Sequence, residues 1–370
     1  MVAEARVTAA ARPLEEVGVD LGPRSYPVVI GSEVLREVGP RLAAAGFRGR
    51  CGVVTSERIG ALYREPVVDS LRGAGFEPTV VQVADGEEHK NLGSLALIYD
   101  RLLGIGLERR SPLVALGGGV VTDLAGFAGA TLLRGLPTAL LPTTLLAQVD
   151  AAIGGKTGVN HAAGKNLIGA FHQPRLVLAD VDVLRTLPRR ELVAGLAEVI
   201  KYGVIRDAAL LRYVEENLAS ILGLEPAVLV LVIAACARLK AGVVARDERE
   251  ERGERAVLNF GHTVGHAIET LGGYRELLHG EAVAIGMVAA ARVSRALGRC
   301  ATGTVERLER LLGRAGLPTE IPRGVDPAAL GRVMQEDKKS ADGRVRFVCL
   351  EEIGRTTFVD LSPQQIVSHL

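Results

Sequence analysis

Residues 113–119 read LVALGGG, so three glycines follow directly on four apolar residues. A short apolar run of this kind is typical of a strand buried in a parallel sheet, and a helix is expected from about Thr122. A strand that ends in a glycine turn at the start of a helix brings backbone N–H groups within reach of a phosphate. The stretch lacks the GxGxxG spacing of the dinucleotide fingerprint, so a tight connection without a ligand is an equal alternative.

Further apolar runs precede and follow this strand along the chain, at Cys51–Thr55, Thr79–Val83, Thr138–Leu141 and Leu176–Leu178. Helical segments separate the first four strands, and this alternation predicts a doubly wound parallel sheet. Earlier in the chain, residues 16–30 alternate around a Gly-Pro pair and predict a hairpin, which leads into a first helix near residues 34–45. The N-terminal half is therefore expected to be an α/β, Rossmann-like domain.

Beyond Pro188 the strand signals nearly disappear, and long segments with a helical period follow. These cover residues 189–204, 225–245 and 281–297, and one late hairpin is expected from residues 344–350 and 356–359. A chain of 370 residues is long enough for two cores. We expect a Rossmann-like domain over residues 1–187, beginning with a loose leader of 13 residues, and a mostly α-helical domain over residues 188–370. The active site is expected in the cleft between them.

Composition narrows the class of protein. Lys and Arg total 44 against 43 Asp and Glu, so a net charge of +1 gives no general field that would attract nucleic acid or an anionic membrane. The four cysteines are far apart and form no CxxC pair, which favours reduced thiols in the cytoplasm. The first residues do not resemble a secretory signal, and the apolar stretch Val228–Ala237 is too short to cross a bilayer. A soluble, cytoplasmic protein with a buried helix at this stretch is expected.

Polar residues and glycines are dense between residues 142 and 166. Two lysines, an aspartate and several amides between glycine turns suit a pocket for a phosphate and hydroxyl groups. Gly155-Lys156-Thr157 is similar to the end of a P-loop, but Asp150 stands where that motif requires a glycine, which argues against a P-loop kinase. Lysine is rare in the chain, which suggests a need for a compact ammonium at its few positions, although chance is the alternative. The lysines are Lys90, Lys156, Lys165, Lys201, Lys240, Lys338 and Lys339.

A candidate metal site is formed by residues in the second half. His262 and His266 lie four residues apart on one face of a predicted helix, and His279 follows. The spacing alone is a modest signal, because the HExxH form of the zinc proteases is absent. Two imidazoles and a carboxylate would leave open positions on zinc, as catalytic sites do. Glu198 is the best-placed carboxylate, although Glu198 and Lys201, three residues apart, also fit a surface ion pair.

Taken together and in this order, the motifs resemble the 3-dehydroquinate synthase family, over roughly residues 25–354. The resemblance rests on GEEHK at 86–90, GGGVVTDLAGF at 117–127, LRG at 133–135, PTTLLAQVD at 142–150, GGKTGVN at 154–160, GKNLIGAFHQP at 164–174, AEVIKYG at 197–203 and LNFGHTVGHAIE at 258–269. It implies a Rossmann-like domain followed by a helical domain, with NAD and Zn²⁺ or Co²⁺ between them, and a homodimer.

The resemblance also implies roles for individual residues. Glu198, His262 and His279 match the metal ligands, which leaves His266 to support them or to handle a proton. The positions that match the substrate-binding pattern are Asp150, Lys156, Asn166, Lys201, Lys240, Arg255, Asn259, Lys338 and Lys339, with Arg134 as a phosphate-binding arginine that reaches across a dimer contact. The positions that match contacts to NAD are Glu87, Lys90, Gly118, Gly119, Val120, Asp123, Thr143, Thr144, Lys156, Lys165, Thr186 and Leu187. From its place at a helix start alone, Asp123 could cap the helix or hold a substrate hydroxyl, and capping is the commoner role.

The implied reaction converts 3-deoxy-D-arabino-heptulosonate 7-phosphate to 3-dehydroquinate and phosphate. A hydroxyl is oxidised by NAD, phosphate is eliminated, the ketone is reduced again, and an aldol step closes the ring, so NAD is recovered. One alternative is another sugar phosphate cyclase, which would take an amino analogue or sedoheptulose 7-phosphate. A metal-dependent polyol dehydrogenase would instead accumulate NADH, and a non-catalytic nucleotide-binding regulator would not need the metal residues.

Overall fold

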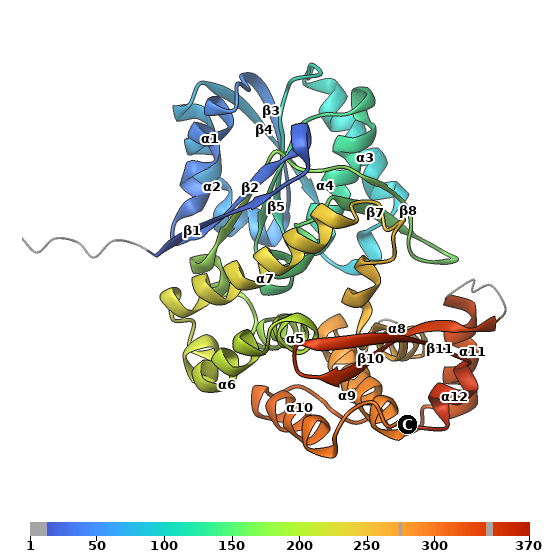
Figure 1. Cartoon of the computed structure of the whole chain (residues 1–370). Coiled ribbons are helices and arrows are strands. Elements are labelled where there is room, and N and C mark those ends of the chain that lie inside the picture. Colours follow the sequence, from blue (N-terminus) through green and yellow to red (C-terminus); the bar gives the residue numbers. More distant parts are fainter. Residues whose placement is uncertain (1–12, 274–275, 338–342) are drawn as a thin grey trace, which may run out of the picture.

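A computed structural model describes residues 13–273, 276–337 and 343–370 (Figure 1). The N-terminal half contains nine strands: β1 (Leu14–Val19), β2 (Tyr26–Gly31), β3 (Gly49–Ser56), β4 (Phe76–Val83), β5 (Leu113–Gly117), β6 (Thr138–Pro142), β7 (Lys156–His161), β8 (Gly164–Phe171) and β9 (Leu176–Asp180). Its helices are α1 (Val38–Ala44), α2 (Glu57–Gly73), α3 (Leu92–Gly104) and α4 (Gly119–Thr131). Short helical turns connect them: η1 (Gly22–Arg24), η2 (Val34–Glu37), η3 (Glu87–His89), η4 (Leu132–Arg134), η5 (Ala147–Ala151) and η6 (Val181–Thr186).

Seven of these strands form one sheet in the order β1-β2-β9-β6-β5-β3-β4. The expected hairpin is confirmed, because β1 pairs antiparallel with β2 in a register that places Leu14 opposite Gly31. The other neighbours are parallel. From β3 the chain proceeds to β4 on one side and then returns to β5 on the other. Ligands of open α/β sheets bind at the carboxyl ends of the strands where the order reverses, and that point lies between β3 and β5.

The C-terminal half is mostly helical, as expected (Figure 1). Its helices are α5 (Arg189–Arg206), α6 (Ala208–Leu222), α7 (Pro226–Arg246), α8 (His262–Leu271), α9 (His279–Ala296), α10 (Thr302–Ala315), α11 (Pro327–Asp337) and α12 (Pro363–Val367), with a short turn η7 (Arg255–Asn259). The late hairpin is confirmed as β10 (Val345–Glu352) and β11 (Arg355–Leu361), which pair antiparallel. These two strands form a separate two-stranded sheet.

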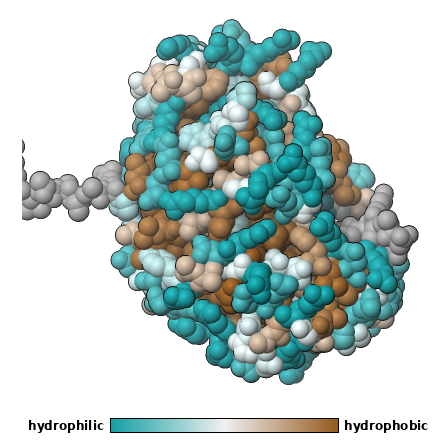
Figure 2. All heavy atoms as spheres, in the orientation of Figure 1, coloured by the Kyte–Doolittle hydropathy of each residue, from teal (hydrophilic) through white to brown (hydrophobic). Residues whose placement is uncertain are grey.

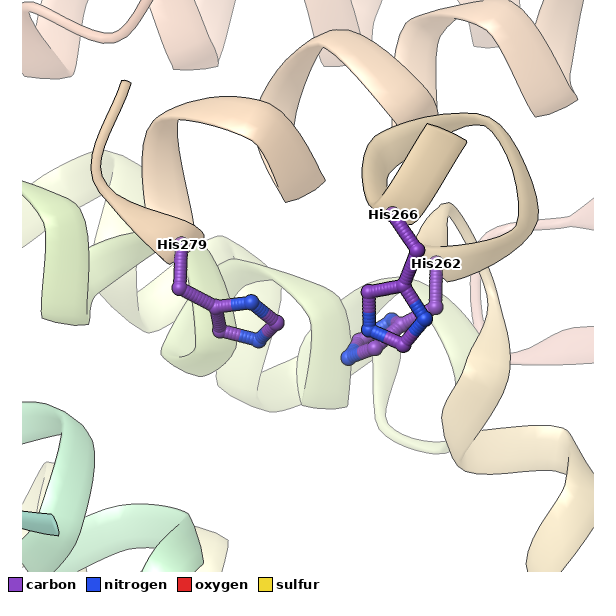
Figure 3. Close-up of side chains that lie close together, drawn as sticks. All are labelled: His262, His266 and His279. Atoms are coloured by element: carbon purple, nitrogen blue, oxygen red, sulfur yellow. The ribbon is translucent and has the colours of Figure 1, made fainter. Parts of the chain in front are cut away.

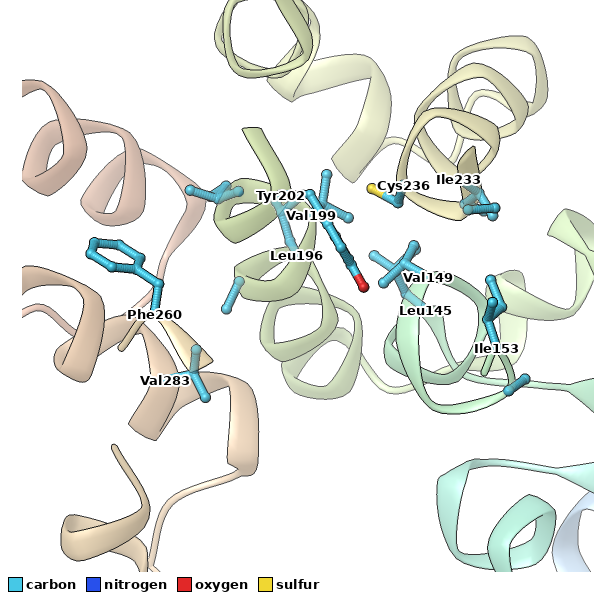
Figure 4. Packing of buried hydrophobic residues seen from close by; sticks show 14 of the residues in the cluster. Leu145, Val149, Ile153, Leu196, Val199, Tyr202, Ile233, Cys236, Phe260 and Val283 are labelled. Carbon is cyan, nitrogen blue, oxygen red and sulfur yellow. The ribbon is translucent and has the colours of Figure 1, made fainter. Parts of the chain in front are cut away.

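One continuous apolar core joins the two halves. Leu145 and Val149, which follow β6, lie in the same buried cluster as Leu196 of α5 and Ile233 of α7, so the segment after β6 packs directly on the helical part (Figure 4). On the outer face in Figure 2, polar side chains cover most of the surface, and apolar residues lie between them, mainly across the middle of the molecule. The junction between the halves is therefore a packed region and not a flexible tether.

Within the described part of the chain, helix α7 is the one element that fits a membrane helix by length and composition. It has 21 residues and is longer than the apolar stretch 228–237 that the sequence pointed to, but 67% of its most apolar window is buried. Helix α7 packs against β1, β2 and α5. This is the environment of a core helix, which is consistent with a soluble protein.

The strands β7 and β8 were not expected, because glycine, asparagine and lysine disfavour strands. They form an antiparallel hairpin beside the main sheet. Its two chains approach closely at opposite glycines, since a Cβ on Gly158 would lie 2.6 Å from the Ile168 carbonyl oxygen and one on Gly169 would lie 2.3 Å from that of Thr157. The glycines that indicated a binding pocket also permit this close pairing.

Candidate active site

Three histidines gather at the starts of α8 and α9 (Figure 3). His262 and His266 lie one turn apart on α8, and His279 is the first residue of α9. Gly261, just before α8, has φ of 80°, and a Cβ there would lie 2.8 Å from the Met287 backbone nitrogen, so only glycine permits this close approach of the two helices. The ligating nitrogens of the three histidines all lie within 4.8 Å of one another. Such a group can hold a metal ion.

Glu198 of α5 faces the same point. Its Oε1 lies 3.4 Å from His262 Nε2 and 3.8 Å from His279 Nε2. The side chain is 0% exposed, and neither carboxylate oxygen accepts a hydrogen bond from the described residues, although Lys201 forms an ion pair with it. A buried carboxylate is costly unless cations or donors compensate it. Lys201 compensates Oε2, whereas Oε1 faces the imidazoles without a hydrogen-bond partner among the described residues, an arrangement that fits a divalent cation.

Two of the imidazoles have displaced pKa values. Burial lowers the pKa of His262 well below its usual value, and the positive charges of Lys201 and the neighbouring histidines act in the same direction. Burial also disfavours the charged form of His279, but the hydrogen bond and charge of Glu269 outweigh it and raise that pKa. His262 is thus held neutral, which is the state that a metal ligand requires.

A second cluster surrounds Asp150, which lies in η5. Lys240 donates to its Oδ1 at 2.7 Å and to its carbonyl oxygen at 2.5 Å, and the Tyr202 hydroxyl donates to the same Oδ1 at 2.7 Å. Burial opposes ionisation of Asp150, but Lys240 and Lys201 outweigh it and lower its pKa. Burial of the Tyr202 hydroxyl, together with the negative charge of the nearby Asp150, raises the pKa of Tyr202 well above its usual value. Asp150 is therefore a charged acceptor and Tyr202 a neutral donor.

A third group contains two cations, Arg255 and Lys156, that could bind an anion. Arg255 is buried and donates to the carbonyl oxygens of Glu248 at 2.7 Å and Gly154 at 3.4 Å, while its Nε has no hydrogen-bond partner among the described residues. The Glu250 carboxylate lies 3.5 Å from that Nε and also forms an ion pair with Lys156. One acidic side chain thus connects two cationic groups that the sequence assigned to a substrate anion. Asn259 lies at the end of η7, the turn that begins with Arg255, and its side chain is exposed.

Several residues assigned to NAD lie near the carboxyl end of strand β5. Gly118 and Gly119 begin α4, and Val120 follows in its first turn. Lys90 donates to Asp123 Oδ2 and to Asn166 Oδ1, both at 2.5 Å. Asp123 is thus not a helix cap. Burial raises the pKa of Asp123 in spite of Lys90.

The hairpin β7–β8 brings further groups to this side. Asn160 donates to Glu87 Oε1 at 2.8 Å, and Asn166 N–H donates to Asn160 Oδ1 at 3.0 Å. Asn166 therefore lies with the residues assigned to NAD, through Lys90, and has φ of 56°. Lys165 donates to Glu269 Oε1 at 3.3 Å.

Two hydroxyl groups after β6 differ in their partners. The buried Thr143 hydroxyl has no hydrogen-bond partner among the described residues, whereas Thr144 accepts from the Ala147 N–H at 3.1 Å. The Thr186 hydroxyl bonds to Tyr63 at 2.6 Å, and Leu187 ends the turn η6 that precedes α5.

Among the described residues, Arg134 is an assigned residue that lies away from these clusters. Arg134 is exposed at the amino end of β6, on the edge of the sheet opposite to the glycine turn, with φ of 66°. Its neighbour Gly135 lines an arginine-rich cavity of about 750 Å³. Lys338 and Lys339 lie outside the described residues.

Sequence reasoning missed three residues of these clusters. Tyr202 and Glu269 lie inside the quoted motifs, but their roles depend on the packing of separate helices. Glu250 lies in an acidic run that is indistinguishable from a solvated loop.

Solved structures with this fold define its class. The chain is similar to ValA (2-epi-5-epi-valiolone synthase) from Streptomyces hygroscopicus subsp. jinggangensis with NAD⁺ and Zn²⁺ bound, with a TM-score of 0.85, 28% identity and coverage of 99% of this chain and 98% of that one. It is also similar to 2-deoxy-scyllo-inosose synthase complexed with carbaglucose-6-phosphate, NAD⁺ and Co²⁺, with a TM-score of 0.86, 26% identity and coverage of 96% and 98%. A glycerol dehydrogenase from Schizosaccharomyces pombe, at 18% identity and a TM-score of 0.66, shares the fold. Together with the histidine and carboxylate cluster, these likenesses place the chain among the sugar phosphate cyclases.

Sequence comparison then gives the family. The family models described as 3-dehydroquinate synthase N-terminal and C-terminal match residues 80–194 and 195–340. A 3-dehydroquinate synthase of Pelobacter propionicus is 51% identical over 350 residues, which cover 95% of this chain and 97% of that protein. One of Desulforamulus reducens is 47% identical over 355 residues, with coverage of 96% and 99%. The chain belongs to the 3-dehydroquinate synthase family, as its motifs predicted.

Proposed function

We propose that the protein converts 3-deoxy-D-arabino-heptulosonate 7-phosphate to 3-dehydroquinate and phosphate, using NAD that is recovered in each turnover. The observation that carries this proposal is the buried Glu198 carboxylate, which pairs with Lys201 and places an Oε1 without a hydrogen-bond partner among the described residues beside the histidine cluster, in a chain about half identical to 3-dehydroquinate synthases. A non-catalytic nucleotide-binding protein would have no use for that buried charge. The substrate is a small sugar phosphate, in agreement with the family.

The metal ligands in this proposal are Glu198, His262 and His279. Support comes from the two short distances between Glu198 Oε1 and the Nε2 atoms, and from the neutral state of His262. His266 lies in the same cluster, and its proposed role is to support the ion or to carry a proton. When bound, a divalent cation acts as a Lewis acid on a substrate hydroxyl, and NAD accepts and returns a hydride.

The substrate would be held at both of its anionic ends. Arg255, Lys240 and Asn259 suit the carboxylate, because the Arg255 Nε donates no hydrogen bond to the described residues and can join a bidentate pair when a substrate carboxylate takes the place of Glu250. Lys156 and Asn166 suit the phosphate, together with Arg134. Charge-assisted bonds of this kind contribute about 1.5–3 kcal/mol each in a shielded pocket. Their main work is to orient the substrate and to neutralise the departing phosphate, which can itself take up the proton of the adjacent carbon.

Asp150 and Lys201 would contact the part of the substrate whose carbons carry hydroxyl groups. Asp150 is held charged by Lys240, so it can accept a hydrogen bond from a substrate hydroxyl and fix the sugar. Lys201 is 1% exposed and lies between the two clusters, since it pairs with Glu198 and lowers the pKa of Asp150. Lys338 and Lys339 complete the proposed substrate set.

The NAD contacts are proposed to come from the glycine turn at the reversal of strand order and from the hairpin beside it. The N–H groups at the start of α4 and the unpartnered Thr143 hydroxyl support this. The proposed set is Glu87, Lys90, Gly118, Gly119, Val120, Asp123, Thr143, Thr144, Lys156, Lys165, Thr186 and Leu187. The proposed domains are residues 1–187 and 188–370, with the active site in the cleft between them.

The protein is further proposed to act as a cytoplasmic homodimer. The exposed position of Arg134, away from the clusters of its own chain, supports a role in the active site of a partner subunit.

The function is tested by the rate of phosphate release from two substrates. Purified protein with NAD and Zn²⁺ should prefer the heptulosonate phosphate over sedoheptulose 7-phosphate by several powers of ten in kcat/KM, because the neutral sugar leaves buried donors unpaired. Arg255→Ala should reduce kcat/KM far more for the acid than for the neutral sugar. Equal or reversed preference would assign the protein to another type of sugar phosphate cyclase.

A further inference from the structure

Glu269 is a buried carboxylate that contacts the histidine cluster from outside. It lies on α8, three residues after His266 and seven after His262, so all three side chains share one helical face. The side chain is 3% exposed. Its Oε2 accepts a hydrogen bond from His279 Nδ1 at 3.1 Å, and its Oε1 accepts one from Lys165 Nζ at 3.3 Å.

The bond to Nδ1 determines which nitrogen of His279 is available. When Nδ1 carries the proton and donates it to Glu269, the lone pair resides on Nε2. That Nε2 lies 3.8 Å from Glu198 Oε1, on the side of the cluster centre. A carboxylate behind a metal-ligating histidine fixes the ring orientation and increases the basicity of the ligand.

We infer that Glu269 is a positioning residue that holds His279 in the orientation and tautomer needed to bind the metal. This inference rests on the proposed metal site. His262 is held differently, because its Nδ1 lies 3.2 Å from the Phe260 carbonyl oxygen. The two imidazoles would therefore have unequal basicity, with His279 the stronger donor to the ion.

The bond to Lys165 connects this arrangement to the other half of the chain. Lys165 lies on β8, whereas Glu269 and His279 lie on α8 and α9. A purely structural role for Glu269 would depend on this link between the halves. A positioning role depends on the bond to His279. Removal of Lys165 separates the two roles, because Lys165→Met leaves the bond to His279 in place.

The test is the dissociation constant for Zn²⁺, measured on the metal-free full-length chain by competition with a fluorescent chelator. Glu269→Gln should weaken Zn²⁺ binding by about 10- to 100-fold, the usual effect of removing such a carboxylate. The matched control is Glu281→Gln. Glu281 also lies in the first turn of α9, two residues from His279, but its carboxylate pairs with Arg190 at 2.7 Å. This control and Lys165→Met should bind Zn²⁺ as the unmodified chain does.

A spectroscopic measurement complements the affinity. The visible absorption of bound Co²⁺ reports its ligand geometry, and it should change in Glu269→Gln but not in Glu281→Gln. The inference is overturned if Glu269→Gln retains normal Zn²⁺ affinity and an unchanged Co²⁺ spectrum while His279→Ala loses the ion. It is also overturned if Lys165→Met weakens Zn²⁺ binding as much as Glu269→Gln does. If the unmodified chain binds no Zn²⁺, the proposed metal site itself fails, and the inference fails with it.

Discussion

Replacement of Tyr202 by phenylalanine removes one hydroxyl from the Asp150 cluster. Tyr202 is fully buried on α5 (Figure 4). Its hydroxyl donates to Asp150 Oδ1 at 2.7 Å. A hydrogen bond to a charged group contributes about 1.5–3 kcal/mol. Lys240 continues to donate to the same oxygen, so the expected loss of unfolding free energy at pH 7 is near the lower limit, about 1.5 kcal/mol.

The loss should depend on pH. Lys240 and Tyr202 lower the pKa of folded Asp150 below that of the unfolded chain, so the stabilisation is complete above the unfolded value of about 3.9 and disappears as pH falls through the folded value. The difference in unfolding midpoint between Tyr202→Phe and the unmodified chain should therefore be constant from pH 6 to 8, and it should shrink only as the pH falls through the lowered pKa of folded Asp150. Because Asp150 is proposed to fix the substrate, KM should also rise.

The assay is urea unfolding followed by circular dichroism over this pH range. A matched control is Tyr99→Phe, which removes a hydroxyl that bonds to the Thr131 hydroxyl at 2.5 Å, without a charged partner. Its effect should be smaller and independent of pH. If Tyr202→Phe unfolds at the same urea concentration as the unmodified chain at pH 7, or if its deficit grows on acidification, the description of the Asp150 cluster is wrong.

Three further predictions concern the proposed site. His279→Ala should lose bound Zn²⁺ in elemental analysis and His266→Ala should retain it, and the reverse result would exclude the proposed ligands. Glu250→Gln should lower KM for the heptulosonate phosphate about two- to five-fold. The reason is that the exposed ion pair between Glu250 and Lys156, worth up to about 1 kcal/mol, no longer competes with the substrate for the cation. A higher KM would mean that Glu250 itself assists binding. Inactive Arg134→Ala and inactive Lys201→Met chains, refolded together, should regain about a quarter of normal activity if each Arg134 acts in the partner's site, because half of the dimers are mixed and each has one complete site. No recovery would place Arg134 in the site of its own subunit.

The sequence predicted the parallel sheet because its strands are short, apolar and separated by helices. It also indicated the metal cluster, but spacing alone could not select among the histidines. His279 lies 17 residues after His262, and only the packing of α8 on α9 brings the two rings to 5.3 Å between centroids. Glu198 comes from a third helix. The sequence offered it as the best-placed carboxylate, and the resemblance to a family then assigned it as a ligand.

Sequence patterns did not predict other features of the structure. The strands β7 and β8 contain glycine, lysine and asparagine between their few branched residues, so the compositional signal for a hairpin was weak. Asn166 was assigned to the substrate phosphate, yet its side chain bonds to Lys90, which was assigned to NAD. Buried partners such as Glu269 are determined by which helices meet, and periodicity within one helix carries no information about that.

The central claim is that hydride transfer is internal to one turnover and that phosphate is eliminated without net oxidation. Phosphate release and NADH absorbance should be followed together in one reaction, with the heptulosonate phosphate in large excess over NAD. We expect one phosphate per substrate consumed, continued turnover after many equivalents of NAD, and no lasting increase in absorbance at the NADH band. Accumulation of NADH in proportion to substrate consumed, without phosphate, would contradict the proposal and identify a polyol dehydrogenase.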